Sequence, residues 1–159
     1  MGVMEYDSTK PQQPGADNPM AKFVTVTLKH SDCELSEQIA YLRKCFVKLR
    51  SSSFFRRKCR GGIWFLQVKK SKRSKQWHAH LHCLIDSDFM DRRTLSGLWE
   101  KITKDSMVTD IRLVTDNDKA ANEVARYCSA SARLAEFGSS DAIEIFYALH
   151  GKRISGTWG

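Results

Sequence analysis

The chain has 159 residues, of which 42% are hydrophobic and 28% are charged, and its formal net charge is +8 at pH 7. These values are typical of one folded domain, and they exclude a largely disordered chain. They also exclude a membrane protein, because no apolar run approaches the roughly 20 residues needed to cross a bilayer. The positive charge favours a polyanionic partner, nucleic acid before membrane.

The cysteines and the first residues predict a reducing, cytoplasmic location. The beginning of the chain lacks the apolar segment of a signal peptide. The five cysteines are odd in number and form no CxxC pair, which argues against a disulfide framework. They are Cys33, Cys45, Cys59, Cys83 and Cys128.

The first part of the chain predicts an arm, a strand and a helix. Residues 1–20 mix proline, glycine and polar residues without periodicity, so we expect a flexible arm before a single domain at 21–159. Residues 23–29 alternate as a strand does. Ser31 and Glu34 have the spacing of a capping box for the next helix. That helix carries an apolar stripe of Leu35, Ile39, Leu42, Phe46 and Leu49.

The rest of the chain alternates strands and helices. Ser51–Ser53 and the basic cluster after it predict a loop, and residues 62–69 and 77–85 predict two strands of a hairpin. A helix, a strand at 107–114 and two more helices follow, and the glycine-rich tail 151–159 stays unassigned. The expected stripes are Leu95, Leu98, Trp99 and Ile102; Ala121, Val124, Ala125, Cys128 and Ala132; and Ala142, Ile145, Phe146 and Leu149. Asp116, Asn117 and Asp118 supply caps for the second of these three helices.

This order predicts an α+β fold. Strands joined as hairpins give a central antiparallel sheet, and helices pack against it in a ferredoxin-like or RRM-like arrangement.

Three histidines alternate with apolar residues in the second hairpin strand. His78, His80 and His82 therefore share one face of that strand, and Ala79, Leu81, Cys83 and Ile85 share the other. A row of imidazoles on a rigid strand suits a metal or a phosphate better than it suits a core.

A metal would need a further ligand, and Gln67 on the neighbouring strand is a candidate if it faces the histidines. Gln67 could equally be a surface residue of an edge strand. Two imidazoles, His80 and His82, or three with His78, together with the Gln67 amide oxygen would suit Mn²⁺ or Mg²⁺, while zinc stays open.

The chain also offers a nucleophile and cations. Tyr127 lies beside an apolar helix stripe, where it is either a packing residue or a nucleophile helped by a metal or by Arg126 and Arg133. The basic runs are either solvated loops or a surface that follows phosphates, and we favour the second. The expected DNA-binding residues are Arg56, Arg57, Lys58, Arg60, Lys69, Lys70, Lys72, Arg73, Lys75 and Arg126.

His80-Leu81-His82 resembles the His-hydrophobic-His motif of the HUH endonucleases, and its setting from Trp77 to Ile85 resembles that of plasmid and phage rolling-circle replication initiators with one catalytic tyrosine. Residues 23–28 are similar to the first motif of that family, and residues 123–127 are similar to its tyrosine helix. The resemblance runs from about residue 22 to the end, in the order of the family.

The resemblance implies an enzyme that nicks single-stranded or hairpin DNA at a replication origin and transfers the strand. It implies that Tyr127 attacks the scissile phosphate, forms a 5′-phosphotyrosine and frees a 3′-OH. It also implies a divalent metal, Mn²⁺ or Mg²⁺, on His80, His82 and Gln67.

The chain departs from the family in two respects. Many members carry a lysine three or four residues after the tyrosine, where this chain has Ala130 and Ser131. Arg133 is the candidate substitute. A helicase domain, common in the viral initiators, is absent, so we expect either a separate helicase as partner or a chain that is only the nicking domain.

Two other functions fit the same residues. The histidine run also resembles the histidine-triad nucleotide hydrolases and transferases, in which the middle histidine would be the nucleophile without a metal. A non-catalytic single-strand-binding sheet could stack bases on Trp64, Phe65 and Trp77, but it would leave the clustered histidines unexplained.

Overall fold

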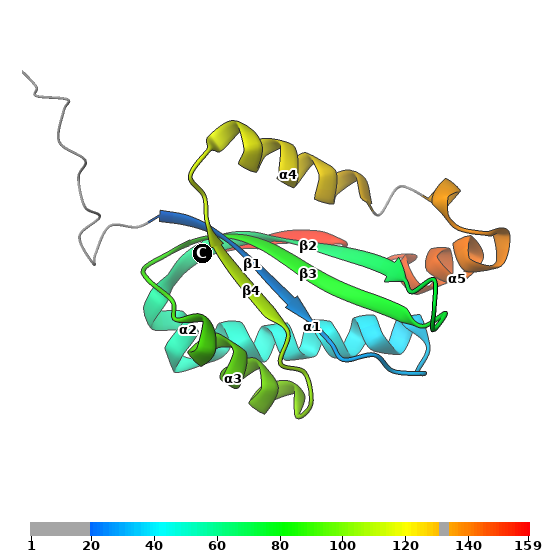
Figure 1. Ribbon diagram of the computed structural model, residues 1–159, viewed down its shortest axis with the longest axis horizontal. Coiled ribbons are helices and arrows are strands. Elements are labelled where there is room, and N and C mark those ends of the chain that lie inside the picture. Colours follow the sequence, from blue (N-terminus) through cyan, green and yellow to red (C-terminus); the bar gives the residue numbers. More distant parts are fainter. Residues whose placement is uncertain (1–19, 131–133) are drawn as a thin grey trace, which may run out of the picture.

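A five-stranded antiparallel sheet forms the centre of the fold, in a computed structural model that describes residues 20–130 and 134–159 (Figure 1). The strands are β1 (Met20–Thr27), β2 (Cys59–Lys70), β3 (Trp77–Ser87), β4 (Thr109–Leu113) and β5 (Ser155–Trp158). The helices are α1 (Leu35–Ser51), α2 (Ser53–Lys58), α3 (Arg92–Thr103), α4 (Asn117–Ala130) and α5 (Ser139–Leu149), with a 3₁₀ turn at Leu134–Glu136. The α+β prediction is confirmed, while residues 1–19 of the expected arm lie outside the described residues.

The strand order is β4-β1-β3-β2-β5, and every neighbouring pair is antiparallel. Apart from the short helix α2, the elements from β1 to β4 follow one another as β1-α1-β2-β3-α3-β4. This is the ferredoxin-like order, in which β1 and β3 lie side by side in the middle of the sheet. The expected hairpin is β2–β3. Within the described residues, no helix combines the length and the apolarity that crossing a bilayer requires.

The two faces of β3 differ as the alternation predicts. Ala79, Leu81, Cys83 and Ile85 are at most 1% exposed and lie in the main core. The predicted stripe of α1 covers this face, and α1 and α3 lie on the same side of the sheet (Figure 1). The histidines project to the opposite side, where α4 crosses the sheet.

Two local predictions near α1 are wrong. Ser31 does not cap a helix, because its Oγ accepts a hydrogen bond from the Cys33 N–H and the helix begins only at Leu35. The segment after α1 is not a loop throughout, since Ser53–Lys58 form the short helix α2. Ser52 caps that helix by accepting from the Phe55 N–H. A serine side chain that bonds the backbone locally can start a helix as well as break one.

The glycine-rich tail forms β5, which the sequence did not predict. Its pairing brings Gly156 opposite Trp64, where a Cβ would lie 2.8 Å from the indole Nε1. Close packing on Trp64 therefore requires glycine at this position. Because glycine is generally depleted in strands, a glycine-rich segment does not have the composition from which a strand is predicted.

The buried face of α4 is rotated from the predicted stripe. Its N-terminus is capped as expected, with Asp116 accepting from two backbone N–H groups. Ala121, Ala125 and Cys128 are exposed, and Ala132 lies outside the described residues. The residues that face the sheet are Ala120, Val124 and Tyr127, because the tyrosine is the largest apolar group of the helix.

Candidate active site

Three imidazoles form a ladder on the α4 side of β3. The rings of His78 and His80 are stacked with their centroids 6.1 Å apart, and those of His80 and His82 have the same separation. This spacing follows from the strand, in which residues two apart point the same way. The predicted common face of the three histidines is confirmed.

Two threonines of β1 hold the inner imidazoles. The sheet register places Thr25 opposite His82 and Thr27 opposite His80. The Thr25 Oγ1 lies 2.9 Å from His82 Nδ1, and the Thr27 Oγ1 lies 3.0 Å from His80 Nδ1. A partner on one ring nitrogen fixes the orientation of the ring and directs the other nitrogen, Nε2, to a ligand.

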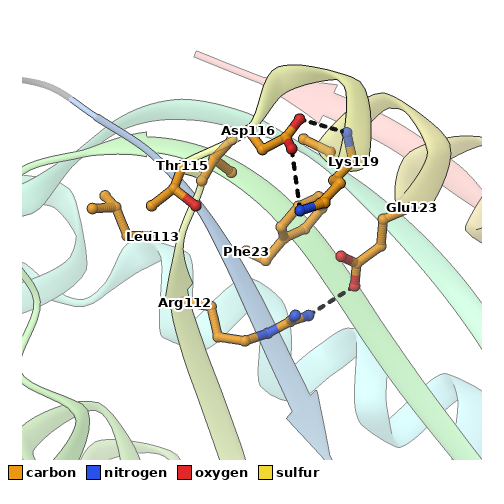
Figure 2. Close-up of a pocket in the computed structure, with 9 residues that line it drawn as sticks. Phe23, Arg112, Leu113, Thr115, Asp116, Lys119 and Glu123 are labelled. Atoms are coloured by element: carbon orange, nitrogen blue, oxygen red, sulfur yellow. Dashed lines mark hydrogen bonds and ion pairs between the residues drawn. The ribbon is translucent and has the colours of Figure 1, made fainter.

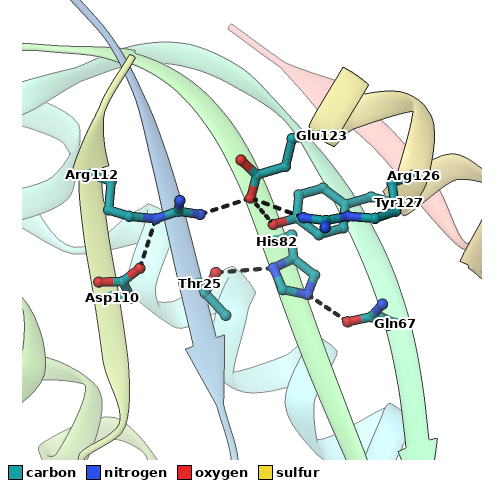
Figure 3. A network of polar contacts seen from close by, with 8 residues as sticks. All are labelled: Thr25, Gln67, His82, Asp110, Arg112, Glu123, Arg126 and Tyr127. Carbon is teal, nitrogen blue, oxygen red and sulfur yellow. Dashed lines mark hydrogen bonds and ion pairs between the residues drawn. The ribbon is translucent and has the colours of Figure 1, made fainter. Parts of the chain in front are cut away.

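Gln67 faces the histidines, which was the condition for its expected role. It is the register partner of His80, and its Oε1 lies 2.9 Å from His82 Nε2 (Figure 3). Because an amide oxygen only accepts, His82 Nε2 carries the proton in this arrangement and the Thr25 hydroxyl donates to Nδ1. A hydroxyl also accepts, so Thr25 can hold the other tautomer, whose Nε2 is open to a metal.

The inner histidines are neutral at physiological pH. Burial, together with the nearby positive charge of Lys69, lowers the pKa of His80 and His82 to about 4. The neutral imidazole is the form that binds a metal, so neither residue has to lose a proton from a charged ring before it can act as a ligand.

The donor set has the chemistry of a site for Mn²⁺ or Mg²⁺. Neighbouring ligands of an octahedral ion bound at about 2.1 Å lie about 3 Å apart, and the Gln67–His82 contact of 2.9 Å meets this requirement. The nearly parallel rings of His80 and His82 have to tilt toward each other before both can reach one ion. The described residues contain no group of three or more His, Cys, Asp or Glu residues that could hold a metal, so an amide or solvent has to complete the set.

His78 is the outermost member of the ladder and has a different environment. Its ring meets His30 edge to face, with centroids 3.7 Å apart. Burial and the charges of His30 and Lys69 lower its pKa. To join the other two as a third imidazole ligand, His78 would have to leave its contact with His30.

Tyr127 lies directly on His82. Their rings are stacked with centroids 4.0 Å apart and an interplanar angle of 7°, and Phe23 and Phe65 pack around the tyrosine. The residue is 7% exposed. The packing alternative for Tyr127 is therefore confirmed, and the ring that packs there is in contact with the last imidazole of the ladder.

Glu123 organises the polar contacts around that hydroxyl, and the sequence analysis did not single it out. Its carboxylate accepts a hydrogen bond from the Tyr127 hydroxyl (Figure 3). It also accepts a hydrogen bond from the Arg112 guanidinium at 2.7 Å, and the Arg126 guanidinium lies 3.7 Å away. Burial opposes its charge, but the hydrogen bonds from Tyr127 and Arg112 hold its pKa below the ordinary value. Burial and the same carboxylate raise the pKa of Tyr127 to about 12. The sequence feature that could have indicated Glu123 is its position four residues before Tyr127, because this spacing places the two side chains on one helix face.

The two basic runs lie at opposite ends of β2. Arg56, Arg57 and Lys58 belong to α2, and Cys59 is about 26 Å from Gln67 at roughly 3.3 Å per residue. Arg60 is paired with Asp86 and Asp88. This end of the sheet is therefore remote from the histidine ladder.

The second run begins beside the ladder. Lys69 is exposed, and Lys72, Arg73 and Lys75 are exposed in the β2–β3 turn. Lys70 differs, because its Nζ lies 2.5 Å from Asp141 and covers the ring of Trp77. Arg126 is exposed on α4, whereas Arg133 and Ser131 lie outside the described residues.

The aromatic residues expected to stack bases in the non-catalytic alternative are not available. Trp64, Phe65 and Trp77 are at most 8% exposed. The indole of Trp77 also donates to Glu144 at 2.8 Å. The sheet therefore does not present these rings to a single strand.

Two cavities lie along α4, and their walls include Glu123 in one and Gln67 in the other. One, of about 180 Å³, lies between β4 and the first turns of α4 (Figure 2). It is lined in part by Phe23, Arg112 and Lys119, and Arg112 is held there by Glu123. The other, of about 360 Å³, lies beside Gln67 and Arg126 at the far end of the helix.

Comparisons of the chain with protein-family models, with curated proteins and with solved structures find no match. The function is therefore inferred from the residues and their geometry.

Proposed function

We propose that this protein is a metal-dependent HUH-type endonuclease, which nicks single-stranded DNA at a replication origin and transfers the strand through a 5′-phosphotyrosine. The observation that carries the proposal is the stacking of Tyr127 on His82 at 4.0 Å. It joins a nucleophile to a candidate ligand set of two neutral imidazoles and an amide.

His80, His82 and Gln67 would hold the ion, with Thr27 and Thr25 orienting the imidazoles. A bound Mn²⁺ or Mg²⁺ supplies polarisation of a phosphate oxygen. Lys69 adds a positive charge beside the same two histidines and favours a phosphate there.

In the proposed step the Tyr127 Oη attacks the scissile phosphorus, the Oη–P bond forms and the P–O3′ bond breaks. Tyr127 is protonated at neutral pH because its pKa is about 12, so its proton has to leave during the attack. Glu123 already accepts the hydrogen bond of that hydroxyl and is placed to take the proton. The departing O3′ takes up a proton from solvent and becomes a free 3′-OH.

The phosphotyrosine conserves the energy of the phosphodiester. A free 3′-OH can therefore attack it later and rejoin the strand without ATP. The substrate in this proposal is a single-stranded or hairpin origin, and a separate helicase supplies the unwound strand.

The test is covalent attachment of DNA. Oligonucleotides with a 3′ label and a randomised central segment are incubated with the protein in Mn²⁺ or in EDTA, and the products are separated on a denaturing protein gel. We expect a slower, labelled protein band that requires Mn²⁺ and is lost in Tyr127→Phe. Tyr147→Phe is the matched control, since Tyr147 is 73% exposed on α5, and it should retain the band.

A labelled band in EDTA, or one that survives Tyr127→Phe, would contradict the proposal. A covalent nucleotide adduct on His80 that forms without metal would instead support a histidine-triad enzyme.

A further inference from the structure

The cavity of about 360 Å³ beside the ladder is called the Phe137 pocket, and it lies where β2 continues beyond its pairing with β5. Strand β5 pairs with β2 only from Gly62 to Phe65, and the pocket begins at Gln67. Gln67 is therefore both a candidate metal ligand and part of the pocket wall. A group bound in the pocket is adjacent to whatever the ladder binds.

Phe137 gives the pocket a fixed aromatic wall. Its ring is half-buried and packs against Trp77, with centroids 5.9 Å apart. Its backbone N–H donates to the Leu134 carbonyl at 3.1 Å, which holds the residue at the end of the 3₁₀ turn. An anchored ring can stack a base with little loss of conformational freedom.

Two exposed cations line the same pocket. Lys69 lies on the histidine side of β2, and Arg126 projects from α4 with a side chain that is 63% exposed. Lys70, which also lines the pocket, is held by Asp141 at 2.5 Å, whereas the contact of the more exposed Arg126 with Glu123 is longer, at 3.7 Å. The acidic Glu136 lines the pocket as well. Lys69 and Arg126 are therefore the groups that can meet the phosphates of a strand.

The combination suits one nucleotide. Ligand pockets span about 300–1,000 Å³, so this one is at the small end of that range. An aromatic wall with cations at the rim is the arrangement with which proteins hold single-stranded nucleic acid, the base on the ring and the backbone on the charges.

We propose that the Phe137 pocket binds the base of the nucleotide next to the scissile phosphate, and that this base stacks on the Phe137 ring. This inference rests on the proposed function, since the endonuclease reaction defines the scissile phosphate. Arg126 and Lys69 hold the backbone on either side of the bound nucleotide.

The test separates binding from cleavage. Single-stranded DNA is enriched from a randomised pool by binding to the wild-type protein, and fluorescence anisotropy then measures the affinity for the enriched sequence. In a series of oligonucleotides, each nucleotide in turn is replaced by an abasic site. We expect one abasic position, next to the nick, to weaken wild-type binding about tenfold, as the loss of a stacked base does.

Phe137→Leu keeps the packing on Trp77 and removes the flat ring. In this variant the same abasic site should have little further effect, because the base no longer has a ring to stack on. Phe89→Leu is the matched control, since Phe89 is 70% exposed beyond the other end of β3, and it should behave as wild type. Thermal melting checks that both variants are folded.

The pocket proposal is overturned if Phe137→Leu shows the same loss as wild type at every abasic position. It is also overturned if the wild-type protein binds no single strand. If the wild type binds and shows the coupling to Phe137 but forms no covalent product, the endonuclease proposal fails while the base pocket stands.

Discussion

Thr25→Val tests the histidine ladder with a change of one functional group. Valine keeps the shape of threonine and removes the hydroxyl that lies 2.9 Å from His82 Nδ1. His82 is only 9% exposed, so water replaces that partner poorly. Leaving a buried polar group without its partner costs about 1–3 kcal/mol.

The consequence should appear in metal binding. Without the hydroxyl, the imidazole is free to rotate, and the tautomer with its proton on Nδ1, which leaves Nε2 open to the metal, loses the acceptor that holds it. We expect the Mn²⁺ affinity, measured by isothermal titration calorimetry, to fall about 10- to 100-fold, which is the usual effect of losing a partner behind a metal ligand. That range equals about 1.4–2.7 kcal/mol and agrees with the cost of the lost hydrogen bond.

The control is Thr109→Val on the opposite face of the sheet. Thr109 is 3% exposed, and its Oγ1 has no hydrogen-bond partner among the described residues. Its replacement should leave Mn²⁺ binding unchanged and the protein no less stable. Equal Mn²⁺ affinities of Thr25→Val and the wild type would refute the role given to the threonine–histidine pair.

Two further predictions concern the hydroxyl and the last strand. Glu123→Gln removes the negative charge that helps to hold the tyrosine proton, so the pKa of Tyr127 should fall from about 12 toward its ordinary value near 10. Ultraviolet titration of tyrosinate, with Tyr127→Phe as the blank, measures this shift, and an unchanged or higher pKa would contradict the hydrogen bond. Gly156→Ala should lower the free energy of unfolding by about 1–3 kcal/mol, because its Cβ would meet Trp64 at 2.8 Å. The control Gly97→Ala, on α3 with open space around it, should raise stability by up to about 1 kcal/mol, and a similar loss in both variants on denaturant unfolding would refute the clash.

The sheet and its two faces were predictable because periodicity decides them. Ala79 and Leu81 point into the core and His80 and His82 away from it, as the alternation requires. The fifth strand was not predictable, since Gly156 serves close packing and carries no strand signal. The buried face of α4 is shifted by about one residue from the predicted stripe. Small residues such as Ala125 can lie on either the buried or the exposed face of a helix, so the sequence alone does not decide which face contacts the sheet.

The site was predictable in part. The sequence indicates His80, His82 and Gln67 as one group, and the register of β2 and β3 brings them together. It does not indicate Thr25 and Glu123, whose roles depend on which strand and which helix face lie beside the histidines. Pairing across 57 residues between Thr25 and His82 follows from topology rather than from local pattern.

The central claim is tested most directly by locating the DNA-bound residue with mass spectrometry. The protein is incubated with randomised single-stranded DNA and Mn²⁺, treated with nuclease and digested with trypsin, which cuts after Arg126 and releases residues 127–133 with Tyr127 as their only tyrosine. The account predicts a 5′-phosphonucleotide on this peptide, formed with Mn²⁺ and absent in EDTA. A modification on the histidine peptide 76–92 instead, or no nucleotide on any peptide, would contradict it.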